Sequence, residues 1–205
     1  MILNLGCIVE GHGEEEAVPM LLRRIQRDVC STLDLTIQPL MRISRCKLVR
    51  PRELERAVDF LARRIRPPRA ILILMDADDS LPCELAPQLL SRARATRPDV
   101  PIGVVLAQRE FEAWFLAAIE SLRGKRGLAA DLQPVDHVES IRDAKGALTA
   151  RMAGPHPYSP VPDQPALTAQ FDMELARSRS PSFDKCWREI TGLFAAAAPE
   201  SQESP

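Results

Sequence analysis

Short runs of apolar residues recur along the first half of the chain, and each one ends in polar or charged residues. Such runs cover Ile2–Val9, residues 35–40, residues 71–75 and Ile102–Ala107. The third run has no polar residue at all, which is typical of a strand buried on both faces, as in parallel sheets covered by helices. The pattern predicts a mainly parallel sheet of about four strands.

The segments between these runs carry apolar residues at helical spacing. Helices are therefore predicted over Glu14–Val29, residues 51–64 and residues 82–95. A fourth helix is predicted to begin at Gln108, directly after the last strand. Alternating strands and helices are typical of βαβ units with right-handed crossovers. The predicted fold class is therefore α/β, with a Rossmann-like sheet flanked by helices.

The pattern changes after Gly124, where apolar periodicity weakens and charged residues, Gly and Pro become more frequent. A helix is predicted over residues 140–152, and two further helices are expected to close the chain. The expected elements after that first helix are a proline-rich loop over residues 154–165 and helices over residues 164–178 and 182–198.

A chain of 205 residues suits one ordinary domain with a small appendage. We expect an α/β domain over residues 1–122, a helical extension packed on it over residues 123–198, and a disordered tail over residues 199–205. The apolar C-terminal helices could pack within the monomer or across a homodimer.

Composition excludes some partners and favours others. The net charge is −1, so any grip on nucleic acid would have to come from local arginine clusters, such as residues 42–52 and 92–97, or from a partner. Such clusters could equally be solvated helix faces. The five cysteines form no C-x-x-C pair, which disfavours zinc and disulfide frameworks and suggests the cytoplasm. No apolar run approaches the ~20 residues of a membrane span.

Carboxylates follow directly after the third apolar run. Asp76 and Asp78 are two positions apart, so in extended chain they point the same way. Two neighbouring carboxylates repel each other unless a cation lies between them, and Mg²⁺ suits hard oxygen ligands. The alternative is that an acid here only caps the next helix, a role that Asp79 or Ser80 could fill.

Other acids follow the other strands. Glu10 ends the first strand, before a turn in which Gly11 and Gly13 permit unusual backbone angles. Glu110 and Glu112 follow the fourth strand, and on a helix they would project about 200° apart, so only one is expected to reach inward. Because ligands bind beyond the carboxyl ends of parallel strands, these acids are expected to meet at one edge of the sheet.

Three further residues are weighed against ordinary structural roles. The acidic triplet that starts at Glu14 suits the first turn of a helix, where negative charge complements the helix dipole. His12 is a candidate for acid–base chemistry or for supporting Glu10, although a lone histidine is more often structural. Lys145 is most simply a surface lysine.

Glu10-Gly11 and the Asp76-Ala77-Asp78 motif resemble those of the Toprim fold, which is shared by topoisomerases, bacterial primases and OLD-family nucleases. The resemblance covers residues 1–122 and implies a metal centre built from Glu10, Asp76 and Asp78. In OLD nucleases a lysine stabilises the phosphate, a role that Lys145 would take here. The resemblance implies phosphoryl transfer with Mg²⁺ or Mn²⁺.

A longer set of motifs covers nearly the whole chain. Residues 10–14, 76–78, 110–114, 158–165 and 182–183 are similar to those of the bacterial family catalogued as domain of unknown function 4276, DUF4276. In that family the Glu-Phe-Glu-Ala-Trp motif recurs, which implies that Glu110 or Glu112 helps to build the site. The resemblance also implies an SMC/ABC-type ATPase partner and a role in phage defence.

These inferences predict a metal-dependent nuclease, or nuclease subunit, that acts on DNA or RNA. Asp76 and Asp78 are expected to bind metal, Glu10 to bind metal or act as the base, and Glu112 or Glu110 to complete a second metal position. A topoisomerase would need a nucleophilic tyrosine and further domains, but the only tyrosine, Tyr158, lies in the proline-rich loop. A primase would need a zinc module. The alternative from another class is a non-catalytic regulatory subunit of an ATPase complex.

Overall fold

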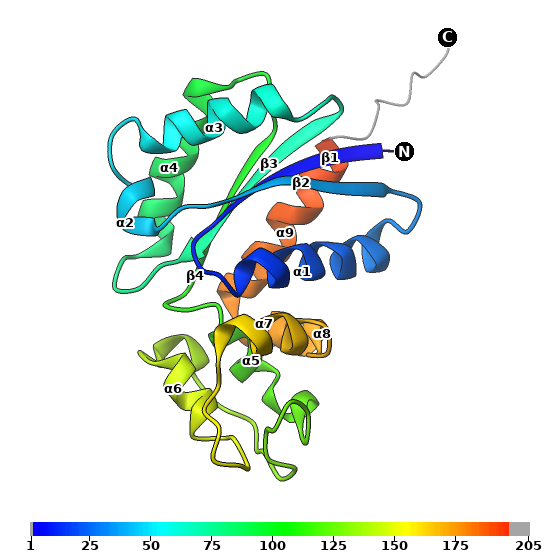
Figure 1. Cartoon of the computed structure of the whole chain (residues 1–205), viewed down its shortest axis with the longest axis vertical. Helices are drawn as coiled ribbons and strands as arrows, with labels where there is room; N and C mark the ends of the chain where they lie inside the picture. Colours follow the sequence, from blue (N-terminus) through cyan, green and yellow to red (C-terminus); the bar gives the residue numbers. More distant parts are fainter. Residues whose placement is uncertain (1, 197–205) are drawn as a thin grey trace.

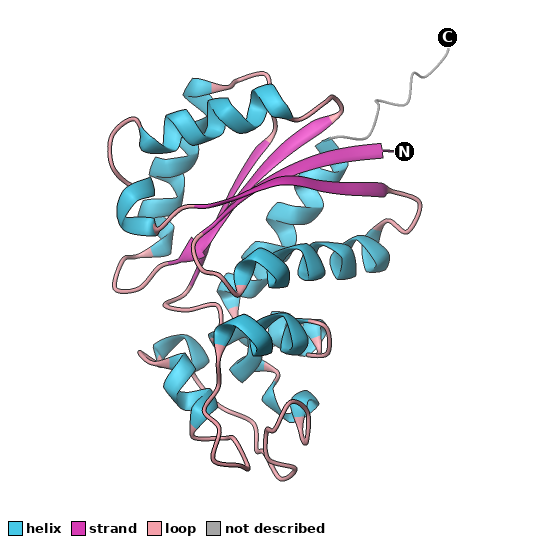
Figure 2. Ribbon diagram, viewed as in Figure 1, coloured by secondary structure: helices cyan, strands magenta, loops and turns pink. Residues whose placement is uncertain are grey.

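The computed structural model describes residues 2–196 and has an α/β architecture (Figures 1 and 2). Four parallel strands form one sheet in the order β2-β1-β3-β4. The strands are β1 (Ile2–Val9), β2 (Asp34–Arg42), β3 (Arg69–Asp76) and β4 (Ile102–Ala107). The predicted fold class, a parallel sheet of about four strands flanked by helices, is therefore confirmed.

Alternate residues of each strand face opposite sides of the sheet and enter two separate cores. On β3, for example, Leu72 and Leu74 belong to one core, whereas Ile71, Ile73 and Met75 belong to the other. All five side chains are fully or almost fully buried. The absence of polar alternation in this strand thus follows from helices covering both faces.

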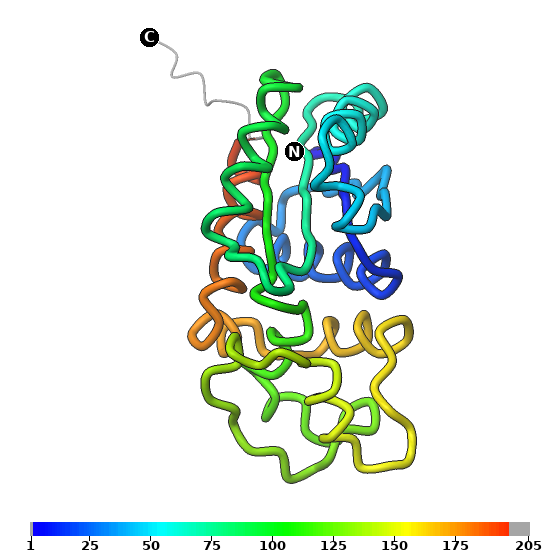
Figure 3. Tube along the Cα trace, turned by 90° about the vertical axis from the view of Figure 1, so that its left-hand side faces the viewer, coloured from blue at the N-terminus to red at the C-terminus, as the bar shows by residue number. Residues whose placement is uncertain are grey.

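Different helices cover the two faces of the sheet (Figures 1 and 3). The apolar residues of α1 (Glu14–Val29) and α9 (Pro181–Ala196) pack in the first core. Those of α3 (Glu53–Arg64) and α4 (Pro82–Thr96) pack in the second. The long helices before β4 match the sequence prediction within two residues, whereas the short helix α2 (Arg45–Leu48) was not expected.

The connections leave the sheet in two directions. The connection from β1 through α1 leads to β2 at one edge of the sheet. The connection from β3 through α4 leads to β4 at the other edge. The carboxyl ends of the adjacent strands β1 and β3 therefore lie where the strand order reverses, which is where open α/β sheets bind ligands.

A second, mostly helical region lies beyond the carboxyl ends of the strands (Figure 1). Its elements are α5 (Ala113–Ala117), η1 (Ile119–Leu122), η2 (Val138–Ser140), α6 (Ala144–Thr149), α7 (Pro160–Thr168) and α8 (Met173–Arg179). Aromatic rings pack together in this region. Phe115 makes edge contacts with Phe111 and Phe171, and Phe171 makes one with Phe183. The ring of Trp114 contacts Phe111 and Phe183.

Four predictions for this region were wrong. The single helix expected over residues 164–178 is two helices, α7 and α8, which are separated by residues 169–172. No helix begins at Gln108: the chain makes a turn in which Arg109 has a positive φ of 62°, and α5 starts only at Ala113. The helix expected over residues 140–152 is shorter and is preceded by a separate 3-10 turn. Part of the proline-rich loop is α7, because prolines at residues 160 and 162 fall in the first turn of a helix, where no N–H is needed.

Among residues 2–196, no helix is long and apolar enough to cross a membrane. The predicted closing helix over residues 182–198 matches α9 as far as Ala196. The remainder of that helix and the predicted disordered tail, residues 199–205, lie outside the described residues.

Candidate functional site

A cavity of about 440 Å³ opens at the carboxyl ends of β1 and β3. The turn after β1, the end of β3, α6 and the first turn of α7 all contribute to its wall. The charged residues in the wall are five acids and one lysine: Glu10, Glu14, Asp76, Asp78, Glu112 and Lys145. The structure thus brings together acids that are far apart in the sequence.

Glu10 follows the last residue of β1 and has one engaged and one unengaged carboxylate oxygen. Its Oε1 accepts a hydrogen bond from the backbone N–H of Arg45, with 3.2 Å between N and O. Its Oε2 is buried and has no hydrogen-bond partner among the described residues. A buried carboxylate oxygen without a donor is costly, so this oxygen is free to accept a ligand.

The glycine turn after Glu10 brings α1 and α7 into close contact. A Cβ atom on Gly13 would lie 2.6 Å from the carbonyl oxygen of Pro160 and would collide with the side chain of Gln164. Gly13 has an ordinary helical φ of −65°, so glycine is needed here for space and not for backbone conformation. The turn lets the first residue of α1 reach back toward β1.

That first residue, Glu14, is part of the site and was not predicted as such. Its Oε2 accepts hydrogen bonds from the backbone N–H groups of Glu10, at 2.7 Å, and Gly11, at 3.1 Å. Only 3% of the residue is exposed. Burial raises the pKa of the Glu14 carboxyl to about 7, although the two hydrogen bonds oppose the rise, and the charges of Glu10 and Glu112 add to it.

Asp76 ends β3 and is held from two sides. Its Oδ1 accepts a hydrogen bond from the backbone N–H of Phe111, at 2.8 Å, and its Oδ2 lies 3.5 Å from Nζ of Lys145. Burial raises the pKa of Asp76 well above its usual value, and the negative charges of Glu14 and Glu112 contribute, whereas Lys145 lowers it. Asp76 is therefore a buried acid whose ionisation is disfavoured, as is common at functional sites.

Asp78 lies at the rim of the cavity in a left-handed backbone conformation, with φ of 48°. Its Oδ2 is paired with Nη1 of Arg45 at 3.1 Å, and more than half of its side chain is exposed. The other Nη of Arg45 bonds to Ser80. The N-cap of α4 is Leu81, without a side-chain cap, so neither Asp79 nor Ser80 fills the capping role considered above.

Glu110 and Glu112 lie in the turn before α5 and both contact Lys145, but they have different surroundings. Oε2 of Glu110 accepts hydrogen bonds from the N–H groups of Ala144, at 2.7 Å, and Lys145, at 3.1 Å, and its Oε1 binds Nζ of Lys145 at 2.9 Å. Glu110 is thus fully engaged in holding the start of α6. Of the two glutamates only Glu112 lines the cavity, as expected for one of them.

Glu112 is completely buried. Its Oε1 accepts a hydrogen bond of 2.9 Å from the hydroxyl of Tyr158. Its Oε2 lies 3.3 Å from Nζ of Lys145, yet no donor is aligned for a hydrogen bond to it. Burial raises the pKa of Glu112, while Lys145 and the Tyr158 hydroxyl lower it.

Lys145 is the cation at the centre of these acids. Burial lowers its pKa, but the nearby charges of Glu112, Asp76 and Glu110 raise it more, so the net shift is upward. Lys145 is therefore charged at neutral pH. One ammonium faces three carboxylates within 3.5 Å.

A protein-family model supports the resemblance suggested by the motifs. The model described as domain of unknown function (DUF4276) matches residues 9–191, which is most of the chain. The chain belongs to the DUF4276 family. No curated protein and no solved structure gave a significant match to it.

The DUF4276 site has donors that suit a hard divalent cation, but they are not gathered around one point. Among residues 2–196, no three His, Cys, Asp or Glu side chains are close enough together to hold a metal ion as they stand. Two cations are paired with acids of the site: Lys145 lies within 3.5 Å of Asp76 and Glu112, and Arg45 is 3.1 Å from Asp78. Oε2 of Glu10 and Oε2 of Glu112 accept no hydrogen bond, and carboxylate oxygens are the hard ligands that Mg²⁺ prefers.

Three members of the DUF4276 site were not assigned to it from sequence. Glu14 was attributed to the helix dipole. Tyr158 was named as a possible nucleophile and as part of a family motif, and Arg45 only as one arginine of the cluster over residues 42–52. The four-residue spacing between Glu10 and Glu14 across a glycine turn could have indicated the first. His12 lines the cavity, but its exposed ring pairs with Glu15 at 3.0 Å.

Proposed function

We propose that the carboxylate-lined cavity binds Mg²⁺ or Mn²⁺ and hydrolyses phosphodiester bonds in nucleic acid. One observation carries the proposal: five acids line the cavity, and the cations paired with them are Lys145 and Arg45. Repulsion among buried carboxylates is relieved by a divalent cation. The pKa values of Glu14, Asp76 and Glu112 are raised mainly by burial and further by the neighbouring carboxylates, as is common for acids at functional sites.

The residues that would hold the cation are Glu10, Asp76, Asp78 and Glu112. When bound, a divalent cation polarises a phosphoryl oxygen and lowers the pKa of a bound water. Glu110 lies outside this set, because the backbone and side chain of Lys145 already engage both of its oxygens. Its role in the proposal is to fix α6 and thereby the position of Lys145.

The chain's own groups supply charge and proton transfer. Lys145, charged at neutral pH and 37% exposed, can reach a phosphate oxygen at the cavity mouth. Glu14, with a pKa of about 7, exchanges a proton near neutral pH. Residues of α7 narrow the cavity and restrict water, since Pro160, Val161 and Gln164 form part of its wall.

The choice of nucleic acid as substrate is supported by the resemblance of Glu10, Asp76 and Asp78 to the Toprim metal centre. The same resemblance supports an ATPase partner. Arg42, Arg109 and Arg142 lie near the acids of this edge, where Arg109 is 3.0 Å from Asp79. Arg142, the most exposed of the three, would contact a phosphate that flanks the reacting one.

The test is to incubate the chain with plasmid DNA, single-stranded DNA and tRNA in Mn²⁺, alone and with ATPases encoded beside its gene. We expect cleavage that requires the metal and is lost in Asp76→Asn, which keeps the size of the side chain and its acceptor for the Phe111 N–H. The matched control is Asp131→Asn, which changes an exposed acid that lines no part of the cavity. Cleavage that survives Asp76→Asn, or no cleavage in any mixture, would contradict the proposal.

A second candidate function is favoured by the ion pairs themselves. Lys145 and Arg45 neutralise part of the cluster without a metal, as in a structural network of a non-catalytic subunit. Such a subunit would bind its ATPase partner equally well with and without Mn²⁺. Partner binding unaffected by both Asp76→Asn and chelation would favour this second function.

A further inference from the structure

The segment after β2, residues 42–56, carries six arginines or lysines and two acids, which gives it a net charge of +4. It starts at the carboxylate cavity, because the backbone N–H of Arg45 donates to Glu10 and the guanidinium of Arg45 pairs with Asp78. From there α2 and the turn after it lead away from the carboxyl ends of the strands to α3 (Figure 1). A positively charged segment thus adjoins the acidic cavity.

Two cations of this segment have no partner within the chain. Lys47 and Arg56 share one acid, Glu53, at 3.8 and 3.3 Å. Exposed pairs of this kind are weak, so Lys47 can exchange the carboxylate for another anion. The side chains of Arg50 and Arg52 are exposed and have no hydrogen bond or ion pair among residues 2–196. The free positive charge is therefore at Arg50 and Arg52, with Lys47 close by in the chain.

The backbone of Arg52 has a conformation that favours glycine. Its φ is 69°, in the left-handed region, where residues other than Gly, Asn and Asp are uncommon. Arg52 is also the N-cap of α3, a position that Ser, Thr, Asp, Asn or Gly usually fill, and its side chain makes no capping hydrogen bond. An arginine is therefore unfavourable here for local stability, which indicates a role of its side chain outside the fold.

Acids of the neighbouring helices do not compensate the free arginines. Glu55 of α3 is bound by Arg92 at 2.8 Å, and Arg92 also donates to the carbonyl oxygen of Arg50 at 2.9 Å. Asp59 of α3 is paired as well. Glu84 is the only acid of α4 and precedes Arg92 by two turns, about 12 Å along the helix. The segment therefore presents positive charge to solvent.

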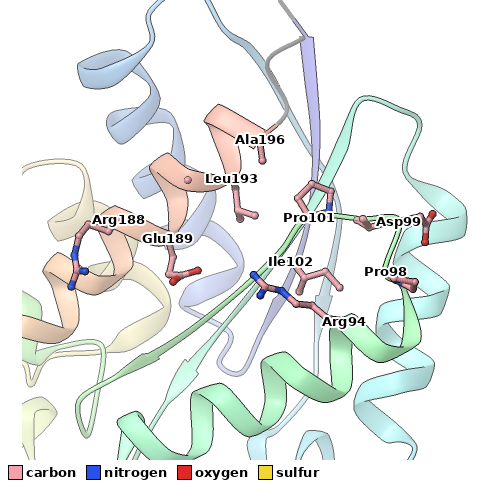
Figure 4. Close-up of a pocket in the computed structure, with 11 residues that line it drawn as sticks. Arg94, Pro98, Asp99, Pro101, Ile102, Arg188, Glu189, Leu193 and Ala196 are labelled. Atoms are coloured by element: carbon pink, nitrogen blue, oxygen red, sulfur yellow. The ribbon is translucent and has the colours of Figure 1, made fainter. Parts of the chain in front are cut away.

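The other arginine cluster, residues 92–97, differs in charge balance and in place. Arg92 and Arg97 are both paired with acids. Arg94 is free, and it projects about 200° away from Arg92 around α4. Figure 4 shows Arg94 and Asp99 at a cavity of about 700 Å³ beside the amino end of β4. That end of the sheet lies opposite the carboxylate cavity, so only the segment after β2 adjoins that cavity.

We propose that Lys47, Arg50 and Arg52, the α2 surface, bind phosphates of a nucleic acid strand on one side of the phosphodiester bond held in the cavity. The inference rests on the proposed function, because the cavity determines where the strand enters. Arginine matches phosphate with a planar fork of donors, and backbone contacts of this kind carry no sequence information. An acidic protein segment would match the charge but not the position beside a phosphodiester site.

The test is a titration of labelled DNA and RNA oligonucleotides in Mn²⁺ with chains that carry Asp76→Asn, which prevents cleavage. Adding Arg50→Gln and Arg52→Gln should weaken binding at least tenfold. It should also make the dependence of affinity on salt less steep, because each phosphate contact releases about one counterion. The matched controls are Arg66→Gln and Arg94→Gln, which remove exposed, free arginines at the amino end of the sheet and should leave binding unchanged.

Arg52→Gly separates binding from folding. Glycine adopts a positive φ without strain and is accepted at an N-cap, so this chain should unfold in urea at a concentration no lower than the parent chain does. It should nevertheless bind oligonucleotides at least threefold more weakly, and by a similar factor for every sequence. Binding equal to or tighter than that of the parent chain would overturn the proposal.

The outcomes distinguish the α2 surface from the proposed function. Binding that needs Arg50 and Arg52, in a chain that never cleaves, would support the surface and contradict hydrolysis. Cleavage with unchanged rate and salt dependence in Arg50→Gln with Arg52→Gln would overturn the surface and leave hydrolysis intact. No binding of any oligonucleotide would overturn the proposal. Binding of polyglutamate in place of oligonucleotides through the same arginines would also overturn it, because the occupant would then be an acidic protein.

Discussion

Carboxylates at the two ends of the same sheet have opposite electrostatic environments. At the amino end, Asp99 accepts hydrogen bonds from Arg97, at 2.7 Å, and Arg69, at 2.8 Å, and these bonds hold its pKa well below the usual range. At the carboxyl end, burial raises the pKa of Asp76, although Lys145 lies 3.5 Å away.

The pKa values of Asp99 and Asp76 shift in opposite directions because the two acids differ in the number of neighbouring cations and in exposure to solvent. Asp99 is exposed and shares two arginines, whereas Asp76, Glu110 and Glu112 share a single lysine. Surface pairs of the first kind contribute little to stability. A buried excess of carboxylates opposes folding and is retained where a ligand relieves it, so the comparison points to the carboxyl end as the functional one.

The largest expected effect comes from removing the charge of Asp76. Asp76→Asn should reduce metal-dependent cleavage at least 100-fold, equivalent to about 3 kcal/mol of barrier. Without metal it should be as stable as the parent chain or more so, because a charge disfavoured by burial is lost. Cleavage rates test the predicted loss of activity, and urea unfolding tests the predicted stability. A large loss of stability without metal would contradict the account.

The pH dependence of stability should have one sign for a buried acid such as Glu14 and the opposite sign for an acid paired with arginine at the surface. The pKa of Glu14 is raised by burial to about 7, so its contribution is fully present below the unfolded value of 4.5 and is lost as pH rises toward 7. The loss is about 3 kcal/mol, since one pKa unit corresponds to about 1.4 kcal/mol. Urea unfolding of the metal-free chain between pH 4.5 and 8 measures it.

Glu14→Gln is the variant that isolates this slope. The amide keeps an acceptor for the N–H groups of Glu10 and Gly11 but does not titrate. Its stability should therefore fall less between pH 4.5 and 7 than that of the parent chain. Parallel pH profiles for the two chains would assign the slope to other groups.

Removing the charge of Lys145 should lower the free energy of unfolding by less than the ionisation of Glu14 does, because Lys145 is partly exposed. Lys145→Met leaves Asp76, Glu110 and Glu112 without a counter-charge, and we expect a loss of about 2 kcal/mol at pH 7. The loss should be smaller at pH 5 than at pH 7, because the raised pKa values of Asp76 and Glu112 mean that these acids take up protons before ordinary carboxylates as pH falls. An equal loss at both pH values, measured by urea unfolding, would show that packing and not charge is responsible.

The smallest effect is expected at a surface pair. Glu55 accepts two hydrogen bonds from Arg92, at 2.8 and 3.0 Å, and these bonds lower its pKa. Glu55→Gln should cost no more than about 1 kcal/mol at pH 7. Here the stabilisation is present above the unfolded pKa and is lost as pH falls, opposite to Glu14. A cost above about 2 kcal/mol would remove the contrast between acids paired with arginine at the surface and the buried carboxylates.

The sequence was sufficient to predict that Glu10, Asp76 and Asp78 would lie at one edge, because strand ends follow from apolar runs and parallel strands align their carboxyl ends. It was insufficient for Glu14 and Tyr158. Their roles depend on a turn that folds α1 back onto β1 and on a loop that brings a tyrosine 46 positions away to Glu112.

The errors in the predicted helices arose where tertiary contacts decide the local structure. Helical periodicity in the aromatic segment after β4 predicted a helix from Gln108, but Phe111 and Trp114 are buried from a turn and a short helix. Prolines were taken to exclude a helix in residues 154–165, whereas α7 begins at one of them. Such choices depend on tertiary contacts that periodicity does not contain.

Direct titration with Mn²⁺ at pH 7, followed by calorimetry, tests the central claim that these acids share a divalent cation. The account predicts saturable binding to the parent chain and to Asp131→Asn, and at least tenfold weaker binding to Asp76→Asn and Glu10→Gln. Binding should release protons, because the cation displaces them from Glu14 and its neighbours. No saturable binding to the parent chain, or equal binding to all four proteins, would contradict it.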